Sequence, residues 1–182
     1  MKAMLVTLAV LFGLLANPAQ AAEDTTRVVV FGDSITFGVG ADAPRRNSWP
    51  ALVGAKRVAR SGGCLVTADC FGRAPAIDTY DRRVLSKRPD VVVLAYGIND
   101  LLAGGTSREI IAGMRQVIRE NRALGIRTYV ATVTPVRLAI DFDRVLLGPN
   151  GNLPRRYDSG DGIHPNALGY RAMAREYARV IH

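Results

Sequence analysis

"VVVFGDSITFGVG", residues 28–40, joins an apolar run to a glycine-rich turn that carries a single serine. The run contains no polar side chain, which is typical of a strand covered on both faces, as in a parallel sheet. Two more largely apolar runs occupy residues 90–96 and 127–133, and a weaker one lies near residues 57–61. The opening stretch therefore predicts that residues 27–31 form the first buried strand of such a sheet.

Amphipathic segments separate the predicted strands. Thr106 and Glu109 have the spacing of a capping box, and apolar residues then follow at helical intervals as far as Gly125. Further helices are predicted over residues 48–55, 75–86 and 166–181. Strands that alternate with helices in one chain predict an α/β fold, a three-layer α/β/α sandwich around a parallel sheet. Ligands of such sheets bind beyond the carboxyl ends of the strands.

The first 21 residues differ in character from the rest of the chain. Lys2 precedes an apolar run, and Ala19-Gln20-Ala21 has the small-x-small pattern of a cleavage site, so we expect residues 1–21 to be a signal peptide. The run is shorter than the roughly 20 residues of a spanning helix, which makes a membrane anchor the weaker interpretation. We expect residues 22–182 to form a single domain, secreted or periplasmic after cleavage near Ala21, without stable membrane insertion.

The chain is basic, with 24 Lys and Arg against 16 Asp and Glu. The leader holds one lysine and no acid, so its removal lowers the formal net charge from +8 to +7. A basic surface can bind nucleic acid, anionic lipid or acidic polysaccharide. The arginines are spread in ones and twos, which favours a solvated surface, and we expect no nucleic-acid partner. A cationic protein that binds envelope polyanions without catalysis is a distant alternative.

Cys64 and Cys70 are the two cysteines of the chain and lie six positions apart. Disulfides persist in exported proteins, so a local bridge that closes this loop is favoured. A metal site would need further ligands, and one of the two histidines is the terminal His182. We therefore expect no metal.

Ser34 follows the first predicted strand, where the sheet should present its binding edge. A catalytic serine needs a base within hydrogen-bond reach and a third group that orients the base. His164 lies in the turn "DGIHPNALGY", three residues after Asp161. Asp161 can bind one ring nitrogen and leave the other for the serine. Ser34, His164 and Asp161 are thus a candidate catalytic triad.

Acyl transfer also needs hydrogen-bond donors for the oxyanion of its tetrahedral intermediate. Gly62 and Gly63 follow the second predicted strand, and a glycine can bring its backbone N–H close to a ligand. Asn99, after the strand at residues 90–96, offers a side-chain amide, and the N–H of Ser34 is a third donor. Each motif alone is an ordinary turn or loop sequence, so their joint order after successive strands is what indicates function.

With these motifs the sequence resembles the GDSL/SGNH family of serine esterases and lipases, over nearly the whole mature chain. "FGDSIT" resembles the first block of the family, "YGIND" its Gly-x-Asn-Asp block, and "DGIHP" its terminal Asp-x-x-His-Pro block. The stretch "KRVARSGGCL" matches least, because it lacks the asparagine that usually precedes the oxyanion glycine. Gly62 is preferred to Gly63 because it follows Ser61 in a family-like Ser-Gly pair.

The resemblance implies Ser34 as nucleophile, His164 as base and Asp161 as orienting acid, with an oxyanion hole formed by the Ser34 and Gly62 amides and the Asn99 side chain. It also implies a flavodoxin-like, five-stranded parallel sheet and no cofactor. The expected reaction is hydrolysis of carboxylic esters with short to medium acyl groups. Thioesters and lysophospholipids are further candidate substrates, and an acyltransferase or deacetylase acting on envelope polysaccharide is the alternative. The expected partner is a small-molecule, lipid or glycan ester.

Several other features are interpreted as structural or selective. Asp33 and Asp100 adjoin the motif residues and are expected to bond the backbone of turns. Trp49 is expected in the core, since large aromatic side chains usually serve packing. Residues 137–159 are predicted to form a surface loop at the rim of the site, where it could select the acyl chain or the alcohol.

Overall fold

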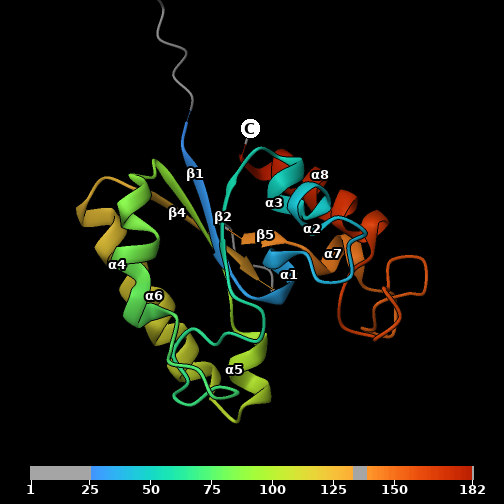
Figure 1. The fold of residues 1–182 in the computed structure, drawn as a ribbon, viewed down its shortest axis with the longest axis horizontal. Helices are drawn as coiled ribbons and strands as arrows, with labels where there is room; N and C mark the ends of the chain where they lie inside the picture. Colours follow the sequence, from blue (N-terminus) through green and yellow to red (C-terminus); the bar gives the residue numbers. More distant parts are fainter. Residues whose placement is uncertain (1–25, 133–138, 182) are drawn as a thin grey trace, which may run out of the picture.

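A single parallel sheet organises the protein, in a computed structural model that describes residues 26–132 and 139–181. Its five strands lie in the order β2-β1-β3-β4-β5, and helices cover both faces (Figure 1). This is the flavodoxin-like order, and it confirms the predicted three-layer α/β/α fold. The strands are β1 (Val28–Gly32), β2 (Lys56–Ala59), β3 (Val91–Ala95), β4 (Arg127–Thr132) and β5 (Ala139–Asp141).

Helices α4 and α6 cover one face of the sheet, and α3, α7 and α8 cover the other. The helices are α1 (Ser34–Phe37), α2 (Pro44–Asn47), α3 (Trp49–Leu52), α4 (Tyr80–Arg83), α5 (Ile98–Leu102), α6 (Ser107–Ala123), α7 (Asp143–Leu146) and α8 (Ala167–Ile181). Two short 3₁₀ helices, η1 (Ile77–Thr79) and η2 (Leu85–Lys87), flank α4. None of the helices in the described ranges is long and apolar enough to cross a membrane.

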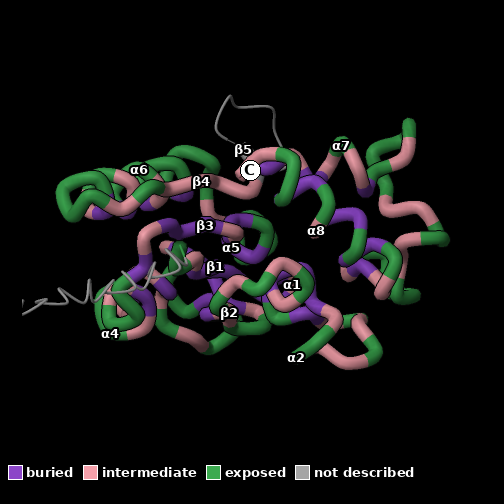
Figure 2. Tube along the Cα trace, turned by 90° about the horizontal axis from the view of Figure 1, so that it is seen from above, coloured by how far each residue is buried: buried purple, intermediate pink, exposed green. Residues whose placement is uncertain are grey.

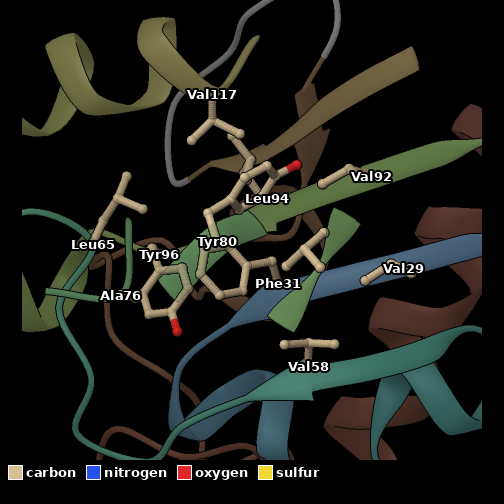
Figure 3. Packing of buried hydrophobic residues seen from close by; sticks show 11 residues of the cluster. Val29, Phe31, Val58, Leu65, Ala76, Tyr80, Val92, Leu94, Tyr96 and Val117 are labelled. Carbon is tan, nitrogen blue, oxygen red and sulfur yellow. The ribbon is translucent and has the colours of Figure 1, made fainter. Parts of the chain in front are cut away.

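Alternate residues of the central strands supply two separate cores, because successive side chains of a strand point to opposite faces. Val29 and Phe31 of β1 pack beneath α4 and α6 (Figure 3), whereas Val30 packs on the side of α8. Trp49 is fully buried in this second core, against Phe142 and Tyr177, as predicted. The middle of the sheet is buried on both sides (Figure 2), which explains why its strands are apolar throughout.

The predicted helix over residues 75–86 is wrong in its extent, because the segment consists of η1, α4 and η2 in succession. The hydroxyl of Thr79 donates to the carbonyl of Ala76 at 3.0 Å. That carbonyl would accept the N–H of Tyr80 in a continuous helix, and such side-chain bonds compete with the helical pattern. The capping box of α6, by contrast, is present as predicted, with both of its reciprocal bonds between Thr106 and Glu109.

The prediction of a loop over residues 137–159 is wrong for the first part of that segment, which holds β5 and α7. The side chains of Ile140, Phe142 and Leu146 are buried in the second core. This part of the segment therefore belongs to the sheet and its helices and is not a surface loop. Residues 147–159 contain no helix or strand, as predicted. The predicted signal peptide lies outside the described residues.

The segment 64–70 is closed by a disulfide and is bound to α5 at the carboxyl edge of the sheet. Cys64 and Cys70 are joined by a disulfide, as predicted. Asp100 is fully buried in α5, and its carboxylate accepts the backbone N–H groups of residues 65–67 and the hydroxyl of Thr67 at 2.8–3.0 Å. The expectation that Asp100 bonds turn backbone is therefore confirmed.

Substitution of Asp100 by asparagine should lower the free energy of unfolding by about 3 kcal/mol, because an amide N–H₂ would then face N–H groups that need an acceptor. Urea unfolding followed by circular dichroism measures this loss. The matched control is Asp78→Asn, at an exposed position of η1, which should change stability by less than about 0.5 kcal/mol. Equal stability of the two variants would show that the Asp100 bonds do not hold the segment.

Candidate active site

Ser34 lies at the point where β1 ends and α1 begins, and only 7% of its surface is exposed. The preceding turn is tight: a β-carbon on Gly32 would lie 2.0 Å from Thr36 Oγ1 and 2.8 Å from the carbonyl oxygen of Ala95. Asp33 caps α1, with its carboxylate accepting the N–H of Ile35 at 3.0 Å, as expected of a turn-bonding residue. The buried strand thus presents Ser34 at the binding edge of the sheet.

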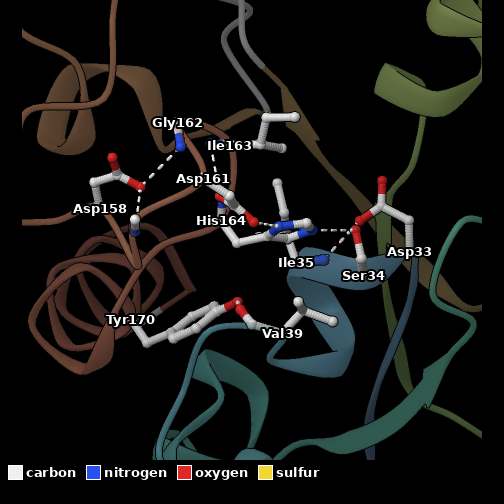
Figure 4. A network of polar contacts seen from close by, with 11 residues as sticks. Asp33, Ser34, Ile35, Val39, Asp158, Asp161, Gly162, Ile163, His164 and Tyr170 are labelled. Atoms are coloured by element: carbon white, nitrogen blue, oxygen red, sulfur yellow. Dashed lines mark hydrogen bonds and ion pairs between the residues drawn. The ribbon is translucent and has the colours of Figure 1, made fainter.

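His164 bridges Ser34 and Asp161 (Figure 4). Its Nε2 lies 2.9 Å from Ser34 Oγ, and its Nδ1 lies 2.5 Å from Asp161 Oδ2. Nucleophile and base are 130 positions apart in the sequence, so only the fold brings them together. With Nδ1–H held by the carboxylate, Nε2 can accept the proton of the serine hydroxyl. The structure places all three predicted triad residues in one chain of contacts.

Backbone contacts shape the turn that carries the acid and the base. Asp161 Oδ1 accepts the N–H groups of Ile163 and His164 at 2.9 and 2.8 Å. These bonds and the contact with the His164 ring hold the pKa of Asp161 well below its usual range, so this carboxylate is charged at neutral pH. Asp158 Oδ1 accepts the N–H groups of Gly160 and Gly162 at 2.9 and 3.0 Å and fixes the start of the turn.

Tyr170 connects α8, which follows the turn of His164, to the segment after α1, the helix that begins at Ser34. It is fully buried in α8, and its hydroxyl donates to the carbonyl of Val39, just after α1, at 2.5 Å (Figure 4). The sequence pattern predicts only that Tyr170 belongs to the helix over residues 166–181, and it assigns no role to Asp158. The signal for Asp158 was its position in the glycine-rich turn, whereas no sequence signal indicated the partner of Tyr170.

Of the predicted oxyanion donors, Gly62 lies on the loop after β2, and Asn99 lies in the first turn of α5, which follows β3. Asn99 is 8% exposed, and one N–H of its side-chain amide donates to the carbonyl of Gly63 at 3.0 Å. The N–H of Gly63 itself donates to the carbonyl of Arg60 at 3.0 Å. The N–H of Gly62 donates to no acceptor within the two described ranges. Gly62, with φ of +65°, is therefore the glycine of this pair whose amide is available to a ligand.

Asp33 is a second carboxylate close to the site, 3% exposed. Burial raises its pKa to about 6, although the bond from Ile35 and the positive charge available on His164 oppose this shift. In the unfolded chain this carboxyl loses its proton near pH 3.8, before the folded form does. Stability contributed by the protonated form is therefore present below pH 3.8 and is lost as the pH rises to about 6.

Asp33→Asn should raise the free energy of unfolding by about 1–3 kcal/mol at pH 8, because the neutral amide keeps an oxygen for Ile35 without a buried charge. At pH 3.5 the gain should vanish, since the wild-type carboxyl is then protonated in the folded state. Urea titrations of both proteins at the two pH values measure this. A variant less stable than wild type at pH 8 would show that the Asp33 charge is compensated.

The described residues contain no group of three or more histidine, cysteine, aspartate or glutamate side chains placed to hold a metal ion.

Comparison with known proteins gives a family and a set of similar folds. The sequence profile of the GDSL-like lipase/acylhydrolase family matches residues 30–139. This range includes Ser34, Gly62 and Asn99 and ends before Asp161 and His164. No curated protein matches the sequence.

Solved structures with a similar fold share low sequence identity with this chain. A protein assigned to the G-D-S-L family from Desulfitobacterium hafniense is 21% identical, with a TM-score of 0.71 over 85% of this chain and 99% of that one. A GDSL-like lipase from Bacteroides thetaiotaomicron is 18% identical, with a TM-score of 0.68 over 86% and 87%. An acetyl xylan esterase is 19% identical, with a TM-score of 0.60 over 86% and 100%. Because the family profile covers more than half of its length, this chain belongs to the GDSL-like lipase/acylhydrolase family and is an ester-hydrolysing enzyme.

Proposed function

We propose that the protein is a serine esterase that cleaves carboxylic esters of short to medium acyl groups, with Ser34, His164 and Asp161 as its catalytic triad. The observation that carries this proposal is the unbroken line of contacts from Ser34 Oγ through the His164 ring to the Asp161 carboxylate. We further propose that the enzyme is secreted or periplasmic, on the basis of the signal-peptide pattern in residues 1–21.

In the first half of the reaction, Ser34 Oγ attacks the ester carbonyl while its proton passes to His164 Nε2. The charged Asp161 stabilises the imidazolium that forms and keeps the ring in place. His164 then gives this proton to the departing alcohol, which leaves an acyl group on Ser34. A water molecule attacks the acyl-enzyme by the same proton transfers, releasing the carboxylic acid and restoring the serine.

The negative charge that develops on the carbonyl oxygen needs donors that are already in place. Gly62 contributes a backbone N–H that no described residue accepts, and the N–H of Ser34 lies at the first turn of α1. Asn99 has a second amide N–H beside the one given to Gly63. These three donors come from the loops after β1, β2 and β3, which open at the same edge of the sheet.

A panel of p-nitrophenyl esters from acetate to decanoate, together with a thioester and a lysophospholipid, tests the proposal. We expect the highest kcat/KM among the short and medium acyl chains. If the folded protein hydrolysed none of these esters, the proposed esterase function would be contradicted. The family membership also favours an enzyme over the cationic binding protein considered from the charge alone.

Deacetylation of an envelope polysaccharide is the second candidate, supported by the fold likeness to an acetyl xylan esterase. Acetate release from acetylated xylan, compared with hydrolysis of p-nitrophenyl acetate, distinguishes it from a general esterase. Analysis of the products in the presence of a glycan acceptor separates both from acyl transfer, because a transferase would give an acylated glycan in place of free acid.

A further inference from the structure

We propose that Arg73, with Arg60 and Arg83, forms an anion-binding subsite beside Gly62, and that the preferred substrates are esters that carry a second, negatively charged group such as a carboxylate. The inference deepens the proposed function, because it names the substrate class of the same site. It also gives a role to the segment that the disulfide closes, which the triad does not use.

Arg73 lies directly against Gly62. A β-carbon on Gly62 would be 3.0 Å from Arg73 Nη1, so the guanidinium group packs over the Cα of this residue. Within the described part of the chain, the Arg73 guanidinium makes no hydrogen bond and no ion pair. An arginine can bind a carboxylate or phosphate with two parallel hydrogen bonds, and here all of its donors are available for one.

The backbone of Arg73 is held by the disulfide-closed segment. Its backbone N–H donates to the carbonyl of Cys70 at 3.1 Å, and Cys70 is bonded to Cys64. The carbonyl of Cys64 accepts the N–H of Ala76 at 2.9 Å, so the chain is held on both sides of the arginine. The backbone that carries Arg73 is therefore already in place when a ligand binds, and only the side chain has to be ordered.

Two more arginines border the same loop. Arg60 precedes Ser61 and Gly62 and is exposed, and Arg83 from α4 donates to the carbonyl of Ala59 at 3.3 Å. Neither is in an ion pair with an acidic side chain of the described residues. The three arginines outnumber the two buried carboxylates Asp33 and Asp100, whose charges also act on Tyr96, so the oxyanion loop keeps a net positive charge that attracts an anionic ligand.

Tyr96 provides an independent observation beneath this loop. Its side chain is 6% exposed, and its hydroxyl is buried with no hydrogen-bond partner among the described residues. A β-carbon on Gly63 would lie 3.5 Å from Tyr96 Cε1, so the ring packs against the loop from inside. Figure 3 shows the hydroxyl pointing away from the centre of the apolar cluster. Buried hydroxyls are rarely left without a partner, and this one is a free donor on a ring that packs against the loop.

The electrostatics of Tyr96 agree with this placement. Burial raises the pKa of the hydroxyl, and the negative charges of Asp33 and Asp100 add to the shift, whereas the positive charges of Arg83 and Arg60 oppose it. Tyr96 therefore stays protonated and able to donate at any working pH. The hydroxyl and the three guanidinium groups are all donors, so the group that fits them is an acceptor-rich anion.

Two matched pairs of esters test the inference and separate an anion on the acyl side from one on the alcohol side. The acyl pair is the p-nitrophenyl monoester of adipic acid against p-nitrophenyl hexanoate. The alcohol pair is 4-acetoxybenzoate against its methyl ester. We expect the wild-type enzyme to show a higher kcat/KM for the charged member of at least one pair, and this preference to fall as salt is added.

Arg73→Gln should reduce the preference for the charged ester about ten-fold or more, the loss expected for one charge-assisted contact, while kcat/KM for the neutral ester changes less than about three-fold. Tyr96→Phe should weaken the same preference without loss of the neutral activity. Arg122→Gln, an exposed arginine in the last turn of α6 at the opposite edge of the sheet, is the matched control.

The possible failures are distinguishable. Neutral esters hydrolysed by the wild type with no preference for either charged ester would overturn the subsite and leave the esterase intact. An equal loss for charged and neutral esters in Arg73→Gln would overturn it as well, since Arg73 would then act on the oxyanion or on the fold. No hydrolysis of any ester by the wild type would instead contradict the proposed function.

Discussion

Ser34→Ala should lower kcat for p-nitrophenyl butyrate by about 10⁴-fold or more, to the small residual rate that binding and oxyanion donors alone support. The substitution removes the one oxygen that lies 2.9 Å from His164 Nε2, and no methyl group can form an acyl-enzyme. The fold should be unaffected, because the cap of α1 is made by Asp33 and the backbone of Ser34 is unchanged.

Covalent labelling makes this prediction independent of substrate choice. An alkyl fluorophosphonate should add one phosphonyl group to the wild type, detected by intact mass, and none to Ser34→Ala. Ser86→Ala is the matched control, since Ser86 lies in η2, where its hydroxyl donates to the carbonyl of Arg82 in α4. Retained activity or labelling in Ser34→Ala would contradict the assignment of the nucleophile.

Much of the sheet could be predicted from the sequence, because its burial dictates its composition. The strands at residues 28–32 and 91–95 have helices on both faces and can carry only apolar side chains. β5 was not predicted, because its segment has no extended apolar run. The strand is three residues long and pairs with β4 alone among the five strands. Short edge strands of this kind depend on tertiary packing more than on their own pattern.

The candidate site was predictable to the extent that its residues follow strands or share a turn. Ser34 and Asn99 each come directly after a buried strand, and Asp161 and His164 are three positions apart. The contact of Tyr170 with Val39 spans 131 positions and has no local signal. The contact between Arg73 and Gly62 also has no local sequence signal. It depends on the disulfide-closed segment, which returns the chain to the loop of Gly62.

His164→Ala should lower kcat nearly as far as Ser34→Ala does, by about 10⁴-fold, because a serine hydroxyl without a base is a poor nucleophile at neutral pH. Added imidazole should restore part of this activity, since it can enter the space of the missing ring and accept the proton of Ser34. The same treatment should leave Ser34→Ala inactive. Steady-state rates with and without imidazole measure both effects.

The double variant Ser34→Ala/His164→Ala tests whether the two residues act as one unit. Because the base works only through the serine, removal of both should cost no more than removal of either, within about three-fold. Asp161→Asn should lower kcat by up to about 10⁴-fold, although Asp161 acts only through the ring of His164, because an amide N–H₂ that faces Nδ1 favours the ring tautomer that cannot accept the proton of Ser34. Losses that multiply in the double variant would mean that His164 serves a step other than activation of Ser34, and the line of contacts through its ring would then be structural.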